Sequence, residues 1–191
     1  GLYYSKGSKT LVSIFTGGLG ALAMYGSEKS ISKEFTSRLA QQELSTASYL
    51  RNGVVAALRE IRSDVHAIDD TVRTAPAMKA WKFAGLAQEA DAVLHLDLNE
   101  VAYSAISIDR YWPRMSAGMT LISTQNNEEL GAATYQVRID PDTSDPRSIT
   151  PLARNVFESG DQLLSQPARA AQALRDDFDR IIRLITNDVA T

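Results

Sequence analysis

Apolar and polar residues alternate most regularly over residues 91–139, and the pattern predicts three consecutive strands there. In residues 92–103, leucines at every second position alternate with polar residues, which is the period of a strand with one buried face. These leucines are Leu94, Leu96 and Leu98. The same alternation recurs over residues 115–121 and 133–139. We therefore expect an antiparallel meander whose apolar face is covered by a layer of helices.

Polar segments separate and follow these strands. Residues 109–113 (Asp-Arg-Tyr-Trp-Pro) form a polar, aromatic link after the first strand, and residues 125–129 (Gln-Asn-Asn-Glu-Glu) supply turn-forming Asn before the third. Residues 140–150 begin with a run that holds two prolines and three Asp residues. Such a composition favours turns, so this segment is expected to be a surface loop.

Apolar residues three or four positions apart predict the helices. The clearest helix starts near Pro167, and its apolar face is formed by Ala171, Leu174, Phe178, Ile181, Ile185 and Val189. A second helix is expected over residues 49–62 and a third over residues 30–44. A fourth is expected over residues 74–90, where Thr74 and Pro76 suit the first positions of a helix.

Short strands are expected over residues 9–15 and 65–69, and residues 1–8 are polar and flexible in character. The predicted order is strand, two helices, short strand, helix, meander, loop and C-terminal helix. It indicates an α/β (α+β) fold with a mixed sheet, because helix-connected strands pair in parallel. The 191 residues fit a single domain, residues 1–191.

Composition limits the function. A net charge of −3 without clustered Lys and Arg argues against nucleic-acid binding and against electrostatic attraction to a membrane surface. The sequence has no Cys, which excludes disulfides, thiolate nucleophiles and Cys-based metal sites. It begins with Gly1 instead of Met, so we expect a trimmed chain from which a targeting segment and any lipid-carrying Cys have been removed.

The most apolar run, residues 11–25, contains a glycine-rich motif. It is about five residues shorter than a membrane-spanning helix and contains three glycines, so a strand and turn are expected. Gly18-Leu19-Gly20-Ala21-Leu22-Ala23 fits the G-x-G-x-x-A turn that binds a dinucleotide after a strand. The acidic end of a second strand is missing, because the region around Glu43 is expected to be helical. A structural turn is favoured, and a cytoplasmic nucleotide-binding protein or small enzyme using Gly18–Ala23 is the alternative.

Catalytic and metal-binding signals are weak. The polar residues His95, Asp97 and Asn99 share one face of the first meander strand, and with His66 they are the candidates for a metal or acid–base cluster. The chain has only two His residues and no H-E-x-x-H or G-x-S-x-G motif. Adjacent carboxylates such as Asp176-Asp177 point apart. We expect no enzyme, no cofactor and no metal, and a solvent-facing or partner-facing sheet surface.

Aromatic side chains concentrate where the first meander strand gives way to the second: Tyr103, Tyr111 and Trp112. If exposed, they suit a protein interface, where Tyr and Trp supply large rigid contacts. If buried, they close the end of the core. Both interpretations remain open at this stage, and the three residues are the candidate interaction site.

Residues 90–190 resemble small bacterial cell-envelope lipoproteins with a fold similar to the curli-export lipoprotein and the N-terminal domain of the Tol translocation protein. The segments that carry the resemblance are Ala90–Leu98, Tyr111–Pro113, Met119–Thr124 and Gly131–Tyr135. It implies a non-catalytic, periplasm-facing domain, anchored to the outer membrane through a lipid in the full-length protein. Its partners would be other proteins of an envelope assembly or transport system, or further copies of itself.

Overall fold

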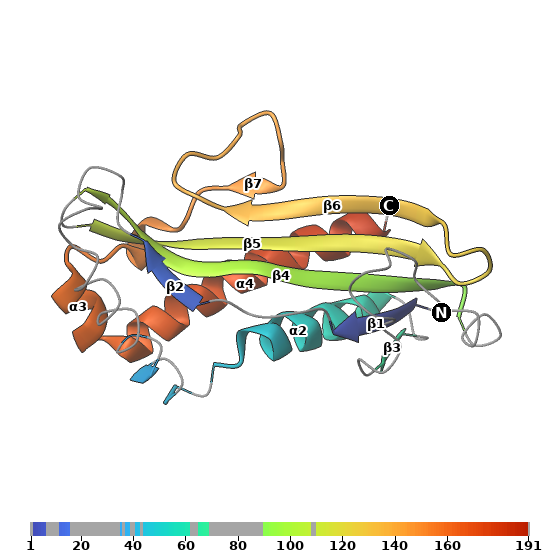
Figure 1. Cartoon of the computed structure of the whole chain (residues 1–191), viewed down its shortest axis with the longest axis horizontal. Helices are drawn as coiled ribbons and strands as arrows, with labels where there is room; N and C mark the ends of the chain where they lie inside the picture. The colour runs from blue at the N-terminus through green and yellow to red at the C-terminus, as the bar shows by residue number, and fades with distance from the viewer. Residues whose placement is uncertain are drawn as a thin grey trace.

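The computed structural model describes residues 2–6, 12–15, 35, 37, 38, 41, 42, 44–61, 65–68, 90–107 and 110–190. In this part of the chain, seven strands form one mixed sheet in the order β3-β1-β4-β5-β6-β7, and β2 pairs with β4 beside β1 (Figure 1). The strands are β1 Leu2–Lys6, β2 Val12–Phe15, β3 Val65–Ile68, β4 Ala92–Ser107, β5 Arg110–Ser123, β6 Glu129–Val137 and β7 Ser148–Ile149.

The first half of the chain supplies most of the parallel pairing of the sheet, and β7 adds a short parallel pair with β6. Strand β1 pairs in parallel with β3 and with the start of β4, and β2 pairs in parallel with Val101–Ser104 further along β4. Strands β2 and β3 fall within the segments predicted as strands. Strand β1 lies within residues 1–8, which the sequence predicts as a flexible segment.

The antiparallel meander is confirmed, since β4 pairs with β5 and β5 with β6. Strand β4 contains a bulge that the alternation did not reveal. Leu98 lies opposite Ala117, whereas Glu100 lies opposite Ser116, so Asn99 is the extra residue. The bulge shifts the alternation by one residue, which places Val101 on the same buried side as Leu98.

The predicted link at residues 109–113 is wrong for Arg110–Pro113, because these four residues begin strand β5. A proline inside a sheet removes one ladder hydrogen bond and is tolerated at an edge. Pairing between β5 and β6 begins only at Met115, so Pro113 lies where β5 has no β6 neighbour. Strand β6 likewise starts at Glu129, inside the expected turn, and ends at Val137.

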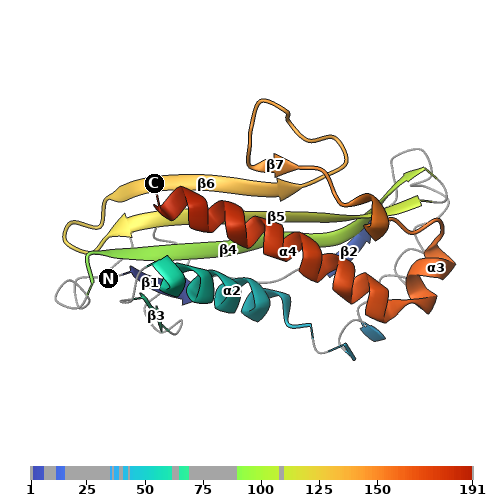
Figure 2. The same cartoon turned by 180° about the vertical axis from the view of Figure 1, so that it is seen from behind.

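Helices cover one face of the sheet. Figures 1 and 2 show α2, Thr46–Ile61, and the long α4, Pro167–Ala190, side by side on the same side of the meander. Both helices fulfil the predictions over residues 49–62 and from Pro167 to Val189. Gly53 lets α2 approach α4 closely, because a Cβ atom there would collide with Cδ1 of Ile182. The core lies between this helical layer and the apolar side of the sheet.

Two short elements precede α4 and were not predicted: the 3-10 helix η3, Ala153–Asn155, and helix α3, Gly160–Ser165. Ser159 caps α3, since its hydroxyl accepts a hydrogen bond from the Gln162 N–H group. The expected loop at residues 140–150 contains the two-residue strand β7. The helix predicted over residues 74–90 lies outside the described residues except for Ala90, and the one over residues 30–44 is described only in part.

Candidate functional site

Over β5 and β6, the side of the meander away from the helices is mostly polar, whereas the same side of β4 buries Val93, His95 and Ala102. Because side chains alternate along a strand, the residues between the buried positions of β5 and β6 all project to this side. We call this surface the open face, and its members are Arg114, Ser116, Thr120, Ala132, Thr134, Gln136 and Arg138. All of them are exposed or half-buried. The open face therefore consists mostly of small polar side chains and ends at two arginines, Arg114 on β5 and Arg138 just after β6.

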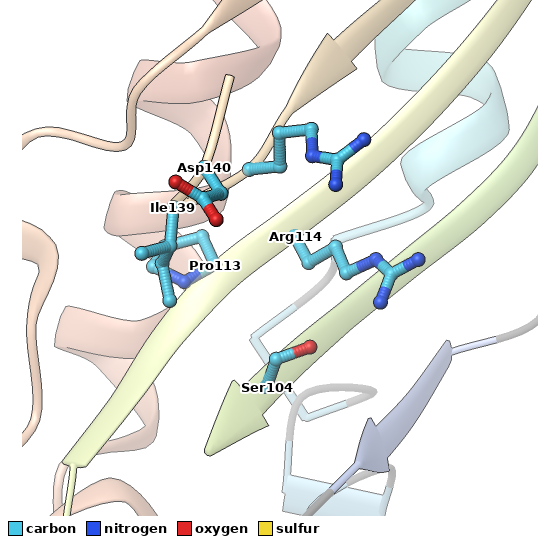
Figure 3. A pocket seen from close by; sticks show the side chains of 6 residues that line it. Ser104, Pro113, Arg114, Ile139 and Asp140 are labelled. Atoms are coloured by element: carbon cyan, nitrogen blue, oxygen red, sulfur yellow. The ribbon is translucent and has the colours of Figure 1, made fainter. Parts of the chain in front are cut away.

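A shallow pocket of about 150 Å³ lies at the arginine end of the open face (Figure 3). Strand β4 contributes Ser104, strand β5 contributes Pro113 and Arg114, and the segment just after β6 contributes three residues in a row. The complete lining is Ser104, Pro113, Arg114, Arg138, Ile139 and Asp140. Two arginines and one carboxylate thus share a pocket whose remaining walls are Pro113, Ile139 and a hydroxyl group.

The two arginines come together because of strand register. Met115 opposite Val137 is the last pair of the β5–β6 ladder, so Arg114 and Arg138 each adjoin this pair and project to the other face. The Nε atom of Arg114 lies 3.0 Å from Oε2 of Glu100, across the neighbouring strand. Arg138 donates its backbone N–H to Ile149, and no hydrogen bond or ion pair of its side chain occurs within the described residues.

Ser104 and Trp112 lie opposite each other in the β4–β5 ladder, on the same face as Arg114. The hydroxyl of Ser104 and the indole Nε1 of Trp112 are both enclosed, and neither has a hydrogen-bond partner in the described part of the chain. An enclosed donor without an acceptor costs free energy, about 1–3 kcal/mol. These two groups are therefore a local weakness of the fold next to the pocket.

A second acidic residue lies close to the pocket but is already occupied. The Asp142 carboxylate accepts hydrogen bonds from both the N–H and the hydroxyl of Ser144, at 2.9 and 2.6 Å. The hydrogen bond from the Ser144 hydroxyl is the main reason that the pKa of Asp142 is lowered. Asp140, by contrast, lines the pocket directly (Figure 3).

The three aromatic candidates lie in different environments. Tyr103 and Tyr111 belong to the core, with exposed fractions of 0% and 4%, and only Trp112 is half-buried. The Tyr103 hydroxyl donates to the carbonyl oxygen of Ala170 at 2.9 Å, and burial raises the pKa of this tyrosine well above its ordinary value. Tyr111 exchanges two backbone hydrogen bonds with Phe157. Of the three, Trp112 is the one that lies partly at the surface.

The histidine candidates do not assemble into one site. His95 is 1% exposed, and its Nε2 lies 2.9 Å from Oδ2 of Asp97. Asn99 is the bulge residue, and His66 lies on β3, separated from β4 by β1. A carboxylate–imidazole pair is able to transfer protons, but a substrate has no access to an imidazole that is enclosed in this way. Within the residues that the structure describes, no three His, Asp or Glu side chains are placed to hold a metal ion.

The glycine-rich turn, Gly18–Ala23, lies outside the described residues. The nucleotide-binding alternative that depends on this turn therefore stays a prediction. Of the adjacent carboxylates, Asp177 is buried and bonded to Arg180 at 3.0 Å. Its neighbour Asp176 bonds to Arg154 instead. The two therefore point apart, as the sequence predicts, and do not form a catalytic pair.

Sequence reasoning missed Arg114, Arg138 and Ser104. Each is an isolated polar residue in the sequence, and no motif connects them. They come together because the ladder pairs Met115 with Val137, which brings the adjoining Arg114 and Arg138 to the same end of the sheet. The predicted elements leave Arg114 between the link at residues 109–113 and the strand at residues 115–121.

Comparisons with known proteins found likenesses of fold alone. No family model and no curated protein matches the chain. A crystal structure of a protein from Caulobacter crescentus described as a lipoprotein shares 17% identity over 75% of this chain and 80% of that one, with a TM-score of 0.42. A Xanthomonas campestris protein assigned to DUF330 shares 12% identity over 100% of this chain and 88% of that one, with a TM-score of 0.44. The PelC dodecamer from Paraburkholderia phytofirmans shares 16% identity over 91% of this chain and 86% of that one, with a TM-score of 0.37. Likenesses this distant do not transfer a function.

Proposed function

We propose that the chain is a non-catalytic component of a bacterial envelope assembly or transport system, and that it acts by binding another envelope protein. The observation that carries this proposal is the open face. One side of the meander is covered by α2 and α4, whereas the other presents exposed polar side chains over two adjacent strands. An exposed surface that extends over two strands suits a protein partner, since protein interfaces are extended and have a polar rim.

The pocket at the end of the open face is smaller than a usual small-molecule site. Such sites are clefts of roughly 300–1,000 Å³ that enclose most of the ligand, whereas this pocket measures about 150 Å³ and is shallow, so it admits one functional group of a larger partner. A second, more open hollow of about 350 Å³ is lined by Leu152, Arg154, Asp176, Asp179, Arg180 and Arg183. The acid–base pair of His95 and Asp97 is closed off, because the imidazole is almost fully buried.

The location is proposed from the sequence resemblance over residues 90–190. In the lipoproteins that this segment resembles, the domain faces the periplasm and a lipid anchors it to the outer membrane. The same arrangement, including the likeness to the curli-export and Tol domains, is part of the present proposal. None of the described helices is long and apolar enough to cross a membrane.

Site-specific photocrosslinking in the native host tests the proposed binding surface. A benzophenone amino acid replaces Thr134 on the open face, and in a matched control it replaces the exposed Arg183 on α4. We expect irradiation to give a discrete adduct with a second envelope protein from position 134 and none from position 183. Equal adducts from both positions, or none from position 134, would contradict the proposal.

A further inference from the structure

We infer that the Arg114–Arg138 pocket binds a carboxylate group presented by the protein partner. The inference rests on the proposed function, because the partner is the source of the carboxylate. It adds the chemical identity of one contact, which is an Asp or Glu side chain or a C-terminal carboxylate of the partner. It assigns that contact to the six residues that line the pocket.

Two like charges line one pocket. Arg114 and Arg138 directly follow the last opposed pair of the β5–β6 ladder, Met115 and Val137, and both belong to the pocket lining. Like charges on adjacent strands repel and destabilise a sheet. Glu100 offsets the charge of Arg114 through its contact with Nε. An anion between the two guanidinium groups would remove the remaining repulsion.

Hydrogen-bond donors gather at the pocket. A guanidinium group carries five N–H donors, and Glu100 contacts Arg114 at Nε. The Arg138 side chain donates no hydrogen bond within the described residues, and the Ser104 hydroxyl at the pocket wall lacks an acceptor there. Figure 3 shows Ser104 and the Arg114 side chain projecting over β4, away from the Asp140 carboxylate. This end of the open face thus keeps N–H and O–H donors beside the carboxylates of Glu100 and Asp140.

Charge balance selects a carboxylate over a phosphate. The lining residues carry two positive charges, from Arg114 and Arg138, and one negative charge, from Asp140. Glu100, in contact with Arg114, adds a second negative charge, so the site is formally neutral. A carboxylate adds one negative charge to this site, whereas a phosphate dianion adds two and is repelled more strongly by Asp140 and Glu100. The planar fork of arginine also matches the two oxygens of a carboxylate.

The test is a titration of the ¹⁵N-labelled full chain followed by NMR. Sodium acetate is the carboxylate probe, inorganic phosphate is the competing anion, and sodium chloride at equal ionic strength is the reference. The reporters are the indole N–H of Trp112 and the backbone amides of Arg114 and Ile139. We expect saturable shifts with acetate, with a dissociation constant on the order of millimolar as for a solvent-exposed charged contact. Phosphate should bind more weakly, and chloride should give no saturation.

Two variants with the same charge change decide the assignment. Arg138→Gln should weaken acetate binding at least tenfold, whereas Arg183→Gln on α4 should leave it unchanged. Both side chains are exposed, so both variants should fold, and thermal unfolding verifies this. Unsaturable acetate shifts, equal binding by both variants, or tighter binding of phosphate than of acetate would overturn the inference. If position 134 still crosslinks while acetate fails to bind, only the pocket assignment is wrong; if acetate binds without any crosslink, the proposed function is wrong.

Discussion

The hydroxyl group of Tyr103 donates a 2.9 Å hydrogen bond to the carbonyl oxygen of Ala170, which joins strand β4 to the first turn of α4. The rings of Phe35 and Phe157 meet the Tyr103 ring edge-on, with centroids 5.3 and 5.5 Å away. Residues from four distant parts of the chain therefore meet at one buried tyrosine. This contact fixes the start of the long helix against the sheet that carries the open face.

Tyr103→Phe should destabilise the fold by about 1 kcal/mol. The substitution keeps the aromatic contacts and removes one buried hydrogen bond, whose net contribution is roughly 0.5–1.5 kcal/mol. Urea unfolding measures the change. Tyr49→Phe is the control, since the Tyr49 hydroxyl bonds to Asp179 in an exposed position, and its loss should cost less than about 0.5 kcal/mol. Equal costs for the two variants would contradict the role given to Tyr103.

Gly53→Ala should destabilise the wild-type chain and stabilise an Ile182→Val background. Alanine favours a helix over glycine by about 1 kcal/mol, but its Cβ would collide with Cδ1 of Ile182, and overpacking costs about 1–3 kcal/mol. Valine at position 182 lacks this atom. A double-mutant cycle by urea unfolding should give a coupling of at least about 0.5 kcal/mol; strict additivity would show that α2 and α4 are not in close contact at Gly53.

Local periodicity explains why much of the fold is predictable. The spacing of apolar residues within one strand or helix shows which of its positions are buried. The alternating leucines at positions 94, 96 and 98 therefore predict the meander, and the apolar face of α4 predicts the last helix. Sheet order does not follow from this spacing, because the pairing of β1 between β3 and β4 depends on contacts between residues far apart in the chain. Pro113 also misled the prediction, since a proline interrupts a strand unless the neighbouring strand stops short of it.

The candidate site was less predictable than the fold. Tyr103, Tyr111 and Trp112 are consecutive aromatic signals in the sequence, yet their exposure depends on what packs against the ends of β4 and β5. The bulge at Asn99 reverses which side chains of β4 face inward beyond that residue, and it places Tyr103 in the core. Arg114 and Arg138 become neighbours only through a register that strand prediction does not supply.

Asp177→Asn should have a higher unfolding free energy than the wild type, and this difference should grow as the pH rises. Burial raises the pKa of Asp177 above its ordinary value of 3.8, and the hydrogen bond from Arg180 only partly offsets this. The folded chain therefore holds this proton to higher pH than the unfolded chain does. The contribution of Asp177 to stability is present below pH 3.8 and is lost as the pH rises through the folded pKa.

Urea unfolding of both proteins from pH 4 to pH 7 measures this effect. The variant keeps the shape of the side chain and cannot ionise, so the difference in unfolding free energy should grow towards neutral pH. Glu158→Gln is the control, because Glu158 and its partner Arg110 are both largely exposed and such pairs contribute little. A difference between wild type and Asp177→Asn that stays constant over this range would refute the burial argument.

Asp188→Asn should loosen the loop at residues 140–150. The Asp188 carboxylate accepts from Nε of Arg147 at 2.6 Å and from the Tyr135 hydroxyl at 2.9 Å, which ties the loop to α4 and β6. Losing the charge weakens the contact with Arg147, and we expect faster amide exchange at Ser148, whose N–H bonds to Asp145. Hydrogen exchange read by NMR tests this. Tyr135→Phe removes the hydroxyl that interacts with Asp188 and Arg147 but leaves the Asp188–Arg147 ion pair in place, so it should change exchange at Ser148 much less. An equal change would assign the anchoring to Tyr135 instead.

The proposed envelope role is tested most directly by the state of the full-length protein in a Gram-negative host. The cells are fractionated, and the mature protein is weighed by mass spectrometry. The account predicts a product in the membrane fraction whose mass exceeds that of its polypeptide by a diacyl or triacyl lipid. An unmodified protein in the cytosol would contradict it, and the glycine-rich turn at Gly18–Ala23 would then become the first place to look for a bound nucleotide.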